Sequence, residues 1–98
     1  MNLTCNFINT ERNEAIEKFI QSLVSKTFTD QGEDLSFIVN IQVQETSQVP
    51  WKCTMYLSRN NAGILSSESQ AANYLTAFSQ ALLRLKRQWD KKDKTLRA

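Results

Sequence analysis

Four basic residues near the C-terminus have a spacing that could bind a polyanion. Separations of three, four and three residues place them along one line of an α-helix, which turns about 100° per residue. Continued toward the N-terminus, this line passes Gln80 and Asn73, and it contains no carboxylate. Guanidinium and ammonium groups without intervening acids are suited to neutralising phosphates, so the line is a candidate RNA-binding surface. The four basic residues are Arg84, Arg87, Lys91 and Lys94.

The charge of the chain is distributed unevenly. Residues 83–98 contain seven Lys and Arg against two Asp, a net of +5, whereas residues 1–82 contain five basic against eight acidic residues, a net of −3. The two aspartates belong to a flank of the helix that also carries Lys86 and Arg97, away from the candidate line. A solvated helix with internal ion pairs is the structural alternative. The one-sided excess of cations favours binding to nucleic acid.

Length and composition indicate one globular domain spanning residues 1–98. The chain is 41% hydrophobic and 22% charged, which is ordinary for a folded domain of this size. It contains no run of about 20 apolar residues, and it begins without the basic and apolar regions of a signal peptide. We therefore expect a cytoplasmic protein that does not bind a membrane.

The residue types give little support for catalysis or for metal binding. The chain has no histidine, the usual general base near neutral pH. Cys5 and Cys53 are its only cysteines, and they are too few and too widely separated for a clustered metal site. We predict no enzymatic activity, no catalytic residue, no metal site, no cofactor and no small-molecule substrate. Both cysteines are interpreted as small buried apolar residues.

Hydrophobic periodicity divides the chain into four strands and two helices. Apolar residues at every second position predict strands, and apolar residues recurring at three and four positions predict amphipathic helices. Asn13 can cap the first helix, and Asn60-Asn61-Ala62-Gly63 is typical of a hairpin turn. Loops are expected at 29–34 and 45–50. In chain order we predict strand 2–7, helix 14–28, strand 35–44, strand 51–58, a short strand 64–67 and helix 73–94.

This order, β-α-β-β-β-α, predicts the α+β class. We expect a four-stranded, mainly antiparallel sheet with both helices packed on one face, similar to double-stranded-RNA-binding domains. Trp89 lies on the apolar stripe of the second helix and is expected in the core. If the opposite face of the sheet is open, Ile38, Tyr56 and Thr54 would form a small exposed patch there, but an ordinary isolated surface aromatic is the favoured interpretation. The residues expected to be buried are Phe19, Ile20, Leu23, Phe37, Val39, Ile41, Phe78, Leu82 and Leu85.

Several residues match a known family in the same order, and those of the first strand and helix match without a gap. Met1-x-Leu3, Asn9, Glu14-Ala15-Ile16-x-x-Phe19-Ile20 and Lys26 match its first strand and helix, and Ala77, Leu85-x-Arg87-Gln88 and Lys91 match its second helix. The chain resembles the short ribosome hibernation-promoting factors, also called ribosomal subunit interface proteins, of the ribosome-associated inhibitor group. The resemblance covers nearly the whole chain, and it is carried by collinearity and element order together.

The resemblance implies a protein that binds the small ribosomal subunit and its rRNA. Such a protein docks in the decoding channel between head and body, occupies the space of tRNA and mRNA, and silences the ribosome during stress or in stationary phase. Lys26, Arg84, Arg87 and Lys91 fall where the family has cations. The implied RNA contacts therefore come from both helices. Off the ribosome we expect a monomer.

The chain departs from the family pattern in both helices. Glu17 and Leu23 stand where the family tends to place a cation, and Asn73-Tyr74-Leu75 stands where it tends to place Asp-Met-Tyr. RNA binding should therefore depend mainly on the second helix. Two alternatives stay open. One is a general double-stranded RNA-binding module, a class that normally begins with a helix, and the other is a diverged relative that serves as a protein-interaction domain.

Overall fold

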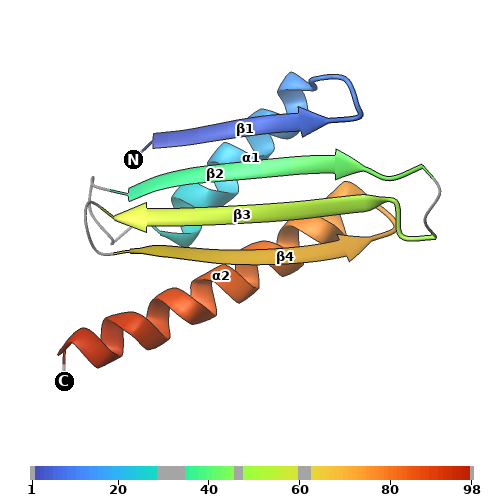
Figure 1. Ribbon diagram of the computed structural model, residues 1–98. Helices are drawn as coiled ribbons and strands as arrows, with labels where there is room; N and C mark the ends of the chain where they lie inside the picture. Colours follow the sequence, from blue (N-terminus) through green and yellow to red (C-terminus); the bar gives the residue numbers. More distant parts are fainter. Residues whose placement is uncertain (1, 29–34, 46–47, 60–62, 98) are drawn as a thin grey trace.

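The computed structural model describes residues 2–28, 35–45, 48–59 and 63–97, and of residues 92–97 the backbone alone. The strands form one sheet, and both helices cover the same face of it (Figure 1). The predicted α+β class and element order are confirmed. The elements are β1 (Asn2–Ile8), α1 (Glu14–Thr27), β2 (Leu35–Val43), β3 (Trp51–Arg59), β4 (Ile64–Ala71) and α2 (Tyr74–Arg97).

The sheet has the strand order β1-β2-β3-β4 and is mixed. β1 and β2 are parallel, because α1 carries the chain back to the end of the sheet at which it started. The other two neighbouring pairs are antiparallel, so the prediction of a mainly antiparallel sheet is confirmed. β4 continues to Ala71, beyond the predicted end at 67. Serines occupy two of its helix-facing positions, which hid the apolar alternation.

The predicted connections are described only in part. The loop at 29–34 lies outside the described residues, and so do the first three residues of the turn at Asn60–Gly63. Gly63 itself has a φ of 97°, a conformation that glycine adopts without steric cost. The connection between β2 and β3 is closed by a 2.7 Å hydrogen bond from the Gln44 N–H to the Pro50 carbonyl.

Local sequence determines where α1 begins and ends. Asn13 has an extended backbone, and its Oδ1 accepts hydrogen bonds from the N–H groups of Ala15 at 2.9 Å and Ile16 at 3.1 Å. This cap satisfies donors that the first turn leaves unpaired. Two glutamates in the first turn are favourable at the positive end of the helix dipole. The helix ends before Phe28, close to the predicted limit.

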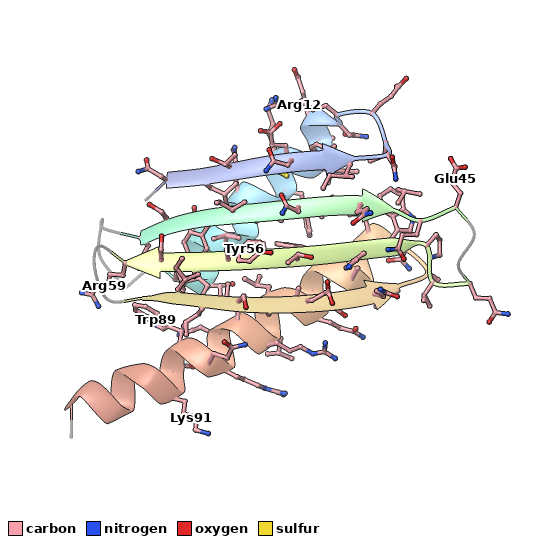
Figure 2. All side chains as sticks on the ribbon, viewed as in Figure 1. Arg12, Glu45, Tyr56, Arg59, Trp89 and Lys91 are labelled. Carbon is pink, nitrogen blue, oxygen red and sulfur yellow. The ribbon has the colours of Figure 1, made fainter. Side chains whose placement is uncertain are left out.

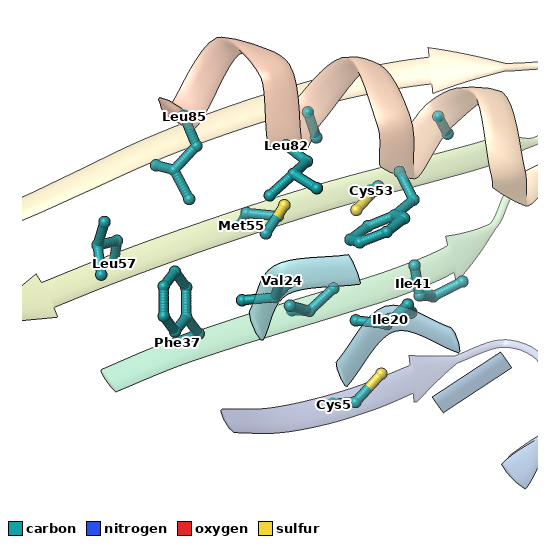
Figure 3. Close-up of a cluster of buried hydrophobic side chains, with 14 of the residues drawn as sticks. Cys5, Ile20, Val24, Phe37, Ile41, Cys53, Met55, Leu57, Leu82 and Leu85 are labelled. Atoms are coloured by element: carbon teal, nitrogen blue, oxygen red, sulfur yellow. The ribbon is translucent and has the colours of Figure 1, made fainter. Parts of the chain in front are cut away.

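The core lies between the sheet and the two helices (Figure 3). Of the nine residues predicted to be buried, seven are buried, Leu23 is partly buried, and Phe19 is 40% exposed. The prediction for Phe19 is wrong because α1 turns Ile20 and Val24 toward the sheet. Phe19 lies beside that stripe, and its ring meets the ring of Phe78 edge-on at a centroid distance of 6.2 Å.

Both cysteines are free and buried, as predicted. Cys5 belongs to β1 and Cys53 to β3, with β2 between them. Burial raises the pKa of the Cys53 thiol from 9.0 to about 12, and it raises the pKa of the Cys5 thiol to about 11. Both side chains therefore remain protonated thiols at neutral pH, the form that is a poor nucleophile.

Candidate nucleic-acid interface

α2 crosses the sheet obliquely, and its C-terminal end lies outside the outline of the sheet, beyond β4 (Figure 1). Trp89 is 6% exposed and packs in the core, as predicted. The basic residues that follow Trp89 belong to the projecting end of the helix. The last basic residues of the predicted cationic segment thus lie on a continuous helix beyond the sheet.

Asn73 of the candidate line caps α2. Its Oδ1 accepts a 2.8 Å hydrogen bond from the N–H of Thr76, and its backbone carbonyl accepts a 3.2 Å hydrogen bond from the N–H of Ala77. Both bonds belong to the first turn of the helix, where capping stabilises otherwise unpaired donors. The Asn73 amide oxygen is therefore engaged in the fold.

Two buried serines of β4 join the sheet to α2. The hydroxyl of Ser67 donates to the backbone carbonyl of Ala81, and the hydroxyl of Ser69 donates to Oε1 of Gln80, each at 2.6 Å. Gln80 of the candidate line therefore contacts the sheet through its amide oxygen. These hydrogen bonds explain how a strand with a polar inner face packs against a helix, since buried hydroxyls require partners.

Two long side chains of α2 reach the main chain of β4. Nη1 of Arg84 donates to the carbonyl of Glu68 at 2.6 Å, and Nε2 of Gln88 donates to the carbonyl of Ser66 at 2.7 Å. Arg84 is exposed at the surface, but one arm of its guanidinium is held by the strand. It lies on the flank of α2 next to β4 rather than on the outermost line.

Arg87 and Lys91 are the next two residues of the candidate line along α2. Both side chains are exposed, and Figure 2 shows Lys91 pointing away from the sheet. Among the described residues, Arg87 has no hydrogen-bond or ion-pair partner. Lys94 continues the same helix, and its side chain lies outside the described part of the chain. Lys26 is exposed in the last turn of α1.

On the opposite flank of α2, positive charge is neutralised by a neighbouring acid. Nζ of Lys86 forms an ion pair with the Asp90 carboxylate at 2.6 Å, and the same nitrogen lies 5.5 Å from the ring centroid of Phe28. The Lys86 charge is thus shared between an acid and an aromatic ring. In the described part of this flank, Lys86 is thus paired with an acid, as expected for a solvated face with internal ion pairs.

Arg59 is a surface cation that the sequence reasoning missed. Its guanidinium carbon lies 5.7 Å from the ring centroid of Trp89 (Figure 2). Arg59 is the last residue of β3, so the end of this strand brings a basic group from the sheet next to Trp89 of α2. Nothing in the spacing of the sequence connects residues 59 and 89, because the contact depends on the register of the sheet beneath α2.

α1 contributes little positive charge at the positions where the chain departs from the family. Glu17 pairs with Arg12 at 2.7 Å, and this hydrogen-bonded contact lowers the pKa of the Glu17 carboxyl. Glu17 is therefore ionised, and it neutralises a neighbouring cation. Leu23 is partly buried against the core. The remaining cations of α1 are Lys18 and Lys26.

The described residues hold no group of three or more His, Cys, Asp or Glu side chains arranged for a metal ion. Within the same part of the chain, neither helix combines the length and the apolar character that crossing a bilayer requires. Binding through surface charge is the chemistry that the arrangement of side chains supports best.

Comparison with known proteins identifies the fold. No family model matches the sequence, and no curated protein matches it either. Among solved structures, the N-terminal domain of Thermus thermophilus Protein Y superposes with a TM-score of 0.76 at 19% identity, covering 90% of this chain and 94% of that domain. A ribosomal subunit interface protein from Coxiella burnetii superposes with a TM-score of 0.74 at 8% identity, covering 96% of this chain and 99% of that one. The resemblance inferred from the sequence is thus confirmed as a shared fold: the chain folds as these two proteins do, from β1 to α2.

Proposed function

We propose that this protein is a ribosome-binding translational silencer. It docks α2 into the decoding channel of the small subunit, contacts rRNA there, and blocks the sites of tRNA and mRNA during stress or stationary phase in the cytoplasm. The observation that carries the proposal is the projecting cationic end of α2, on a fold shared with a ribosomal subunit interface protein. The channel, the rRNA contacts and the stress role follow the family resemblance.

The geometry of α2 suits this task. A helix of 24 residues is about 36 Å long at 1.5 Å per residue, and its core contacts fix its direction. Arg87 and Lys91 are then presented to phosphates at a defined spacing, and the helix backbone that carries them is already ordered before binding. Arg59 adds charge at the base of the same end. RNA lining a channel around α2 would therefore contact basic side chains along one side of the helix.

Two other functions compete with this proposal. A general double-stranded RNA-binding module would use the same cations, and a protein-interaction domain would use them little. Sedimentation of the tagged protein with a cell extract through a sucrose gradient separates the three functions. Migration with small subunits supports the proposal, whereas migration with free RNA or with neither would support one of the alternatives.

The decoding channel itself is tested by competition. We expect the protein to bind vacant small subunits and to be excluded from subunits loaded beforehand with mRNA and tRNA. It should also inhibit translation in vitro, and added mRNA and tRNA should relieve this inhibition. Equal binding to vacant and loaded subunits would place the protein elsewhere on the ribosome.

A further inference from the structure

The side chain of Arg59, at the end of β3, packs on an aromatic ring and is otherwise open to solvent. Its guanidinium carbon lies 5.7 Å from the ring centroid of Trp89, within the range of a cation–π contact. With the rest of the described chain, Arg59 forms neither a hydrogen bond nor an ion pair, and it is exposed. A guanidinium is always charged and carries several N–H donors. These donors are therefore available to an anion from outside the protein.

A second cation of the same cluster differs from Arg59 in having an acid beside it. The ring of Phe28 meets the ring of Trp89 edge-on at a centroid distance of 6.2 Å, and Nζ of Lys86 lies 5.5 Å from the centroid of Phe28. Lys86 also forms its ion pair with Asp90. Two cations thus pack on two neighbouring rings, and the charge of Lys86 is neutralised within the protein. The contact with Trp89 orients Arg59 but leaves its charge without a counterion.

Arg59 and the exposed cations of α2 lie on opposite sides of that helix. Arg87 and Lys91 each stand two residues from Trp89, which corresponds to about 200° around the helix axis and about 3 Å along it. Trp89 faces the core, and Arg59 packs on that side. Figure 2 shows Lys91 pointing away from the sheet, with α2 between it and Arg59. At this level of α2 the two sets of cations are separated by the width of a helix, about 10–12 Å with side chains.

This arrangement restricts the shape of an RNA that contacts both sets. The major groove of an RNA duplex is deep and narrow, and side chains do not read it, so a regular duplex lies against one side of α2. Folded RNA with phosphates on two sides of the helix meets both sets. We propose that Arg59 binds an RNA phosphate on the side of α2 opposite Arg87 and Lys91, so that the RNA encloses the helix from two sides. The inference rests on the proposed function and adds a contact from the sheet to it.

The salt dependence of binding tests the Arg59 contact. One phosphate contact contributes about −0.7 to −0.9 to the slope of log K against log salt concentration. For isolated small subunits titrated over about 50–300 mM salt, Arg59→Gln should make the slope shallower by that amount and weaken binding about fivefold near 100 mM. If Arg59 only shielded Trp89, the substitution would lower stability and leave the slope unchanged.

Two further variants serve as controls. Gln70→Glu, at an exposed position of β4, lowers the net charge by one as Arg59→Gln does, and it should leave the slope unchanged. Arg59→Lys should keep the wild-type slope, because an ammonium group also neutralises one phosphate. Circular dichroism checks that each variant is folded.

A short RNA duplex tests the two-sided arrangement. Arg87→Gln combined with Lys91→Gln should weaken binding both to the duplex and to small subunits, because each presents phosphates to that side of α2. Arg59→Gln should make the slope shallower for small subunits alone. An equal change of slope with both RNAs would show that one face of a duplex reaches all the cations, and it would overturn the two-sided arrangement.

The remaining outcomes separate this inference from the proposed function. If Arg59→Gln leaves the slope for small subunits unchanged while the Arg87 and Lys91 double variant loses binding, Arg59 makes no phosphate contact and the proposed function stands. If Arg59→Lys loses as much affinity as Arg59→Gln, the effect comes from packing on Trp89 and the phosphate contact is wrong. If the wild-type protein shows no salt-dependent binding to small subunits, both the proposed function and the inference fail.

Discussion

Arg84 of α2 and Glu68 of β4 are joined by a 2.6 Å hydrogen bond from the guanidinium to the main-chain carbonyl. One cation of the candidate RNA line therefore also fastens the helix to an edge strand. Arg87, one turn further along, is exposed. The described basic residues of α2 thus include one that fastens the helix to the sheet, Arg84, and one that is exposed without such a hydrogen bond, Arg87.

Replacing Arg84 and Arg87 should separate these two roles. Methionine keeps the length of the side chain and the helix propensity. Arg84→Met should lower the free energy of unfolding by about 1 kcal/mol, the usual value of a hydrogen bond. Arg87→Met should change it by no more than about 0.5 kcal/mol, as for most surface substitutions. Urea denaturation measures both, and equal losses would show that the Arg84 contact contributes nothing specific.

Two adjacent leucines test the orientation of α2. Leu82 is 5% exposed and Leu83 is 51% exposed. Leu82→Ala should cost about 2–5 kcal/mol of stability, because it removes buried methyl groups and leaves a cavity. Leu83→Ala should cost less than about 0.5 kcal/mol. The same urea experiment reports both values, and a larger loss for Leu83 would mean that the helix is rotated from the orientation described.

The sequence predicted those parts of the fold that depend on a repeating apolar pattern. β2 and β3 have an apolar residue at every helix-facing position, and both helices have an apolar stripe, so the limits of these elements were predicted to within a few residues. The end of β4 was missed because Ser67 and Ser69 occupy helix-facing positions where an apolar residue would mark a strand. Their hydroxyl groups instead donate hydrogen bonds to oxygen atoms of α2. Hydrogen bonding between elements has no periodicity in the sequence.

The candidate site, like the fold, has a part that the sequence predicted and a part that it did not. The cationic line on α2 could be predicted, because spacing alone fixes which residues share a helix face. Two contacts could not be predicted from the sequence: the hydrogen bond between Arg84 and β4, and the position of Arg59 beside Trp89. Both contacts depend on where the helix crosses the sheet. Such contacts join residues far apart in the chain, and they become visible only with the tertiary structure.

The buried thiols predict how stability depends on alkaline pH. The unfolded Cys53 thiol ionises near pH 9.0, whereas burial raises its pKa in the folded protein to about 12. Between these values the folded state binds more protons than the unfolded state, so stability falls as the pH rises above about 9. Cys53→Ala should make the decline between about pH 8 and 10.5 shallower. An unchanged slope in the reduced protein would show that Cys53 does not ionise on unfolding.

Ribosome binding should weaken with salt. Four phosphate contacts on duplex-like RNA predict a slope of log K against log salt concentration of about −3 to −4. If the cations were engaged only with internal partners, the slope would be close to zero. Titration of isolated small subunits over about 50–300 mM salt measures it, and a flat response would exclude an interface built on phosphate neutralisation.

The central claim is that the exposed basic residues of α2, Arg87 and Lys91 among them, make the contact, and two charge-matched double variants test it most directly. Arg87→Gln with Lys91→Gln lowers the net charge by two at these positions, and Gln48→Glu with Gln70→Glu lowers it by two elsewhere on the surface. Measured at one salt concentration, the affinity of the first variant for isolated small subunits should fall at least about tenfold, equivalent to about 1.4 kcal/mol. The second variant should bind nearly as the wild type does. Equal losses in both variants would show that the effect is bulk electrostatics, and no loss in the first would contradict docking through α2.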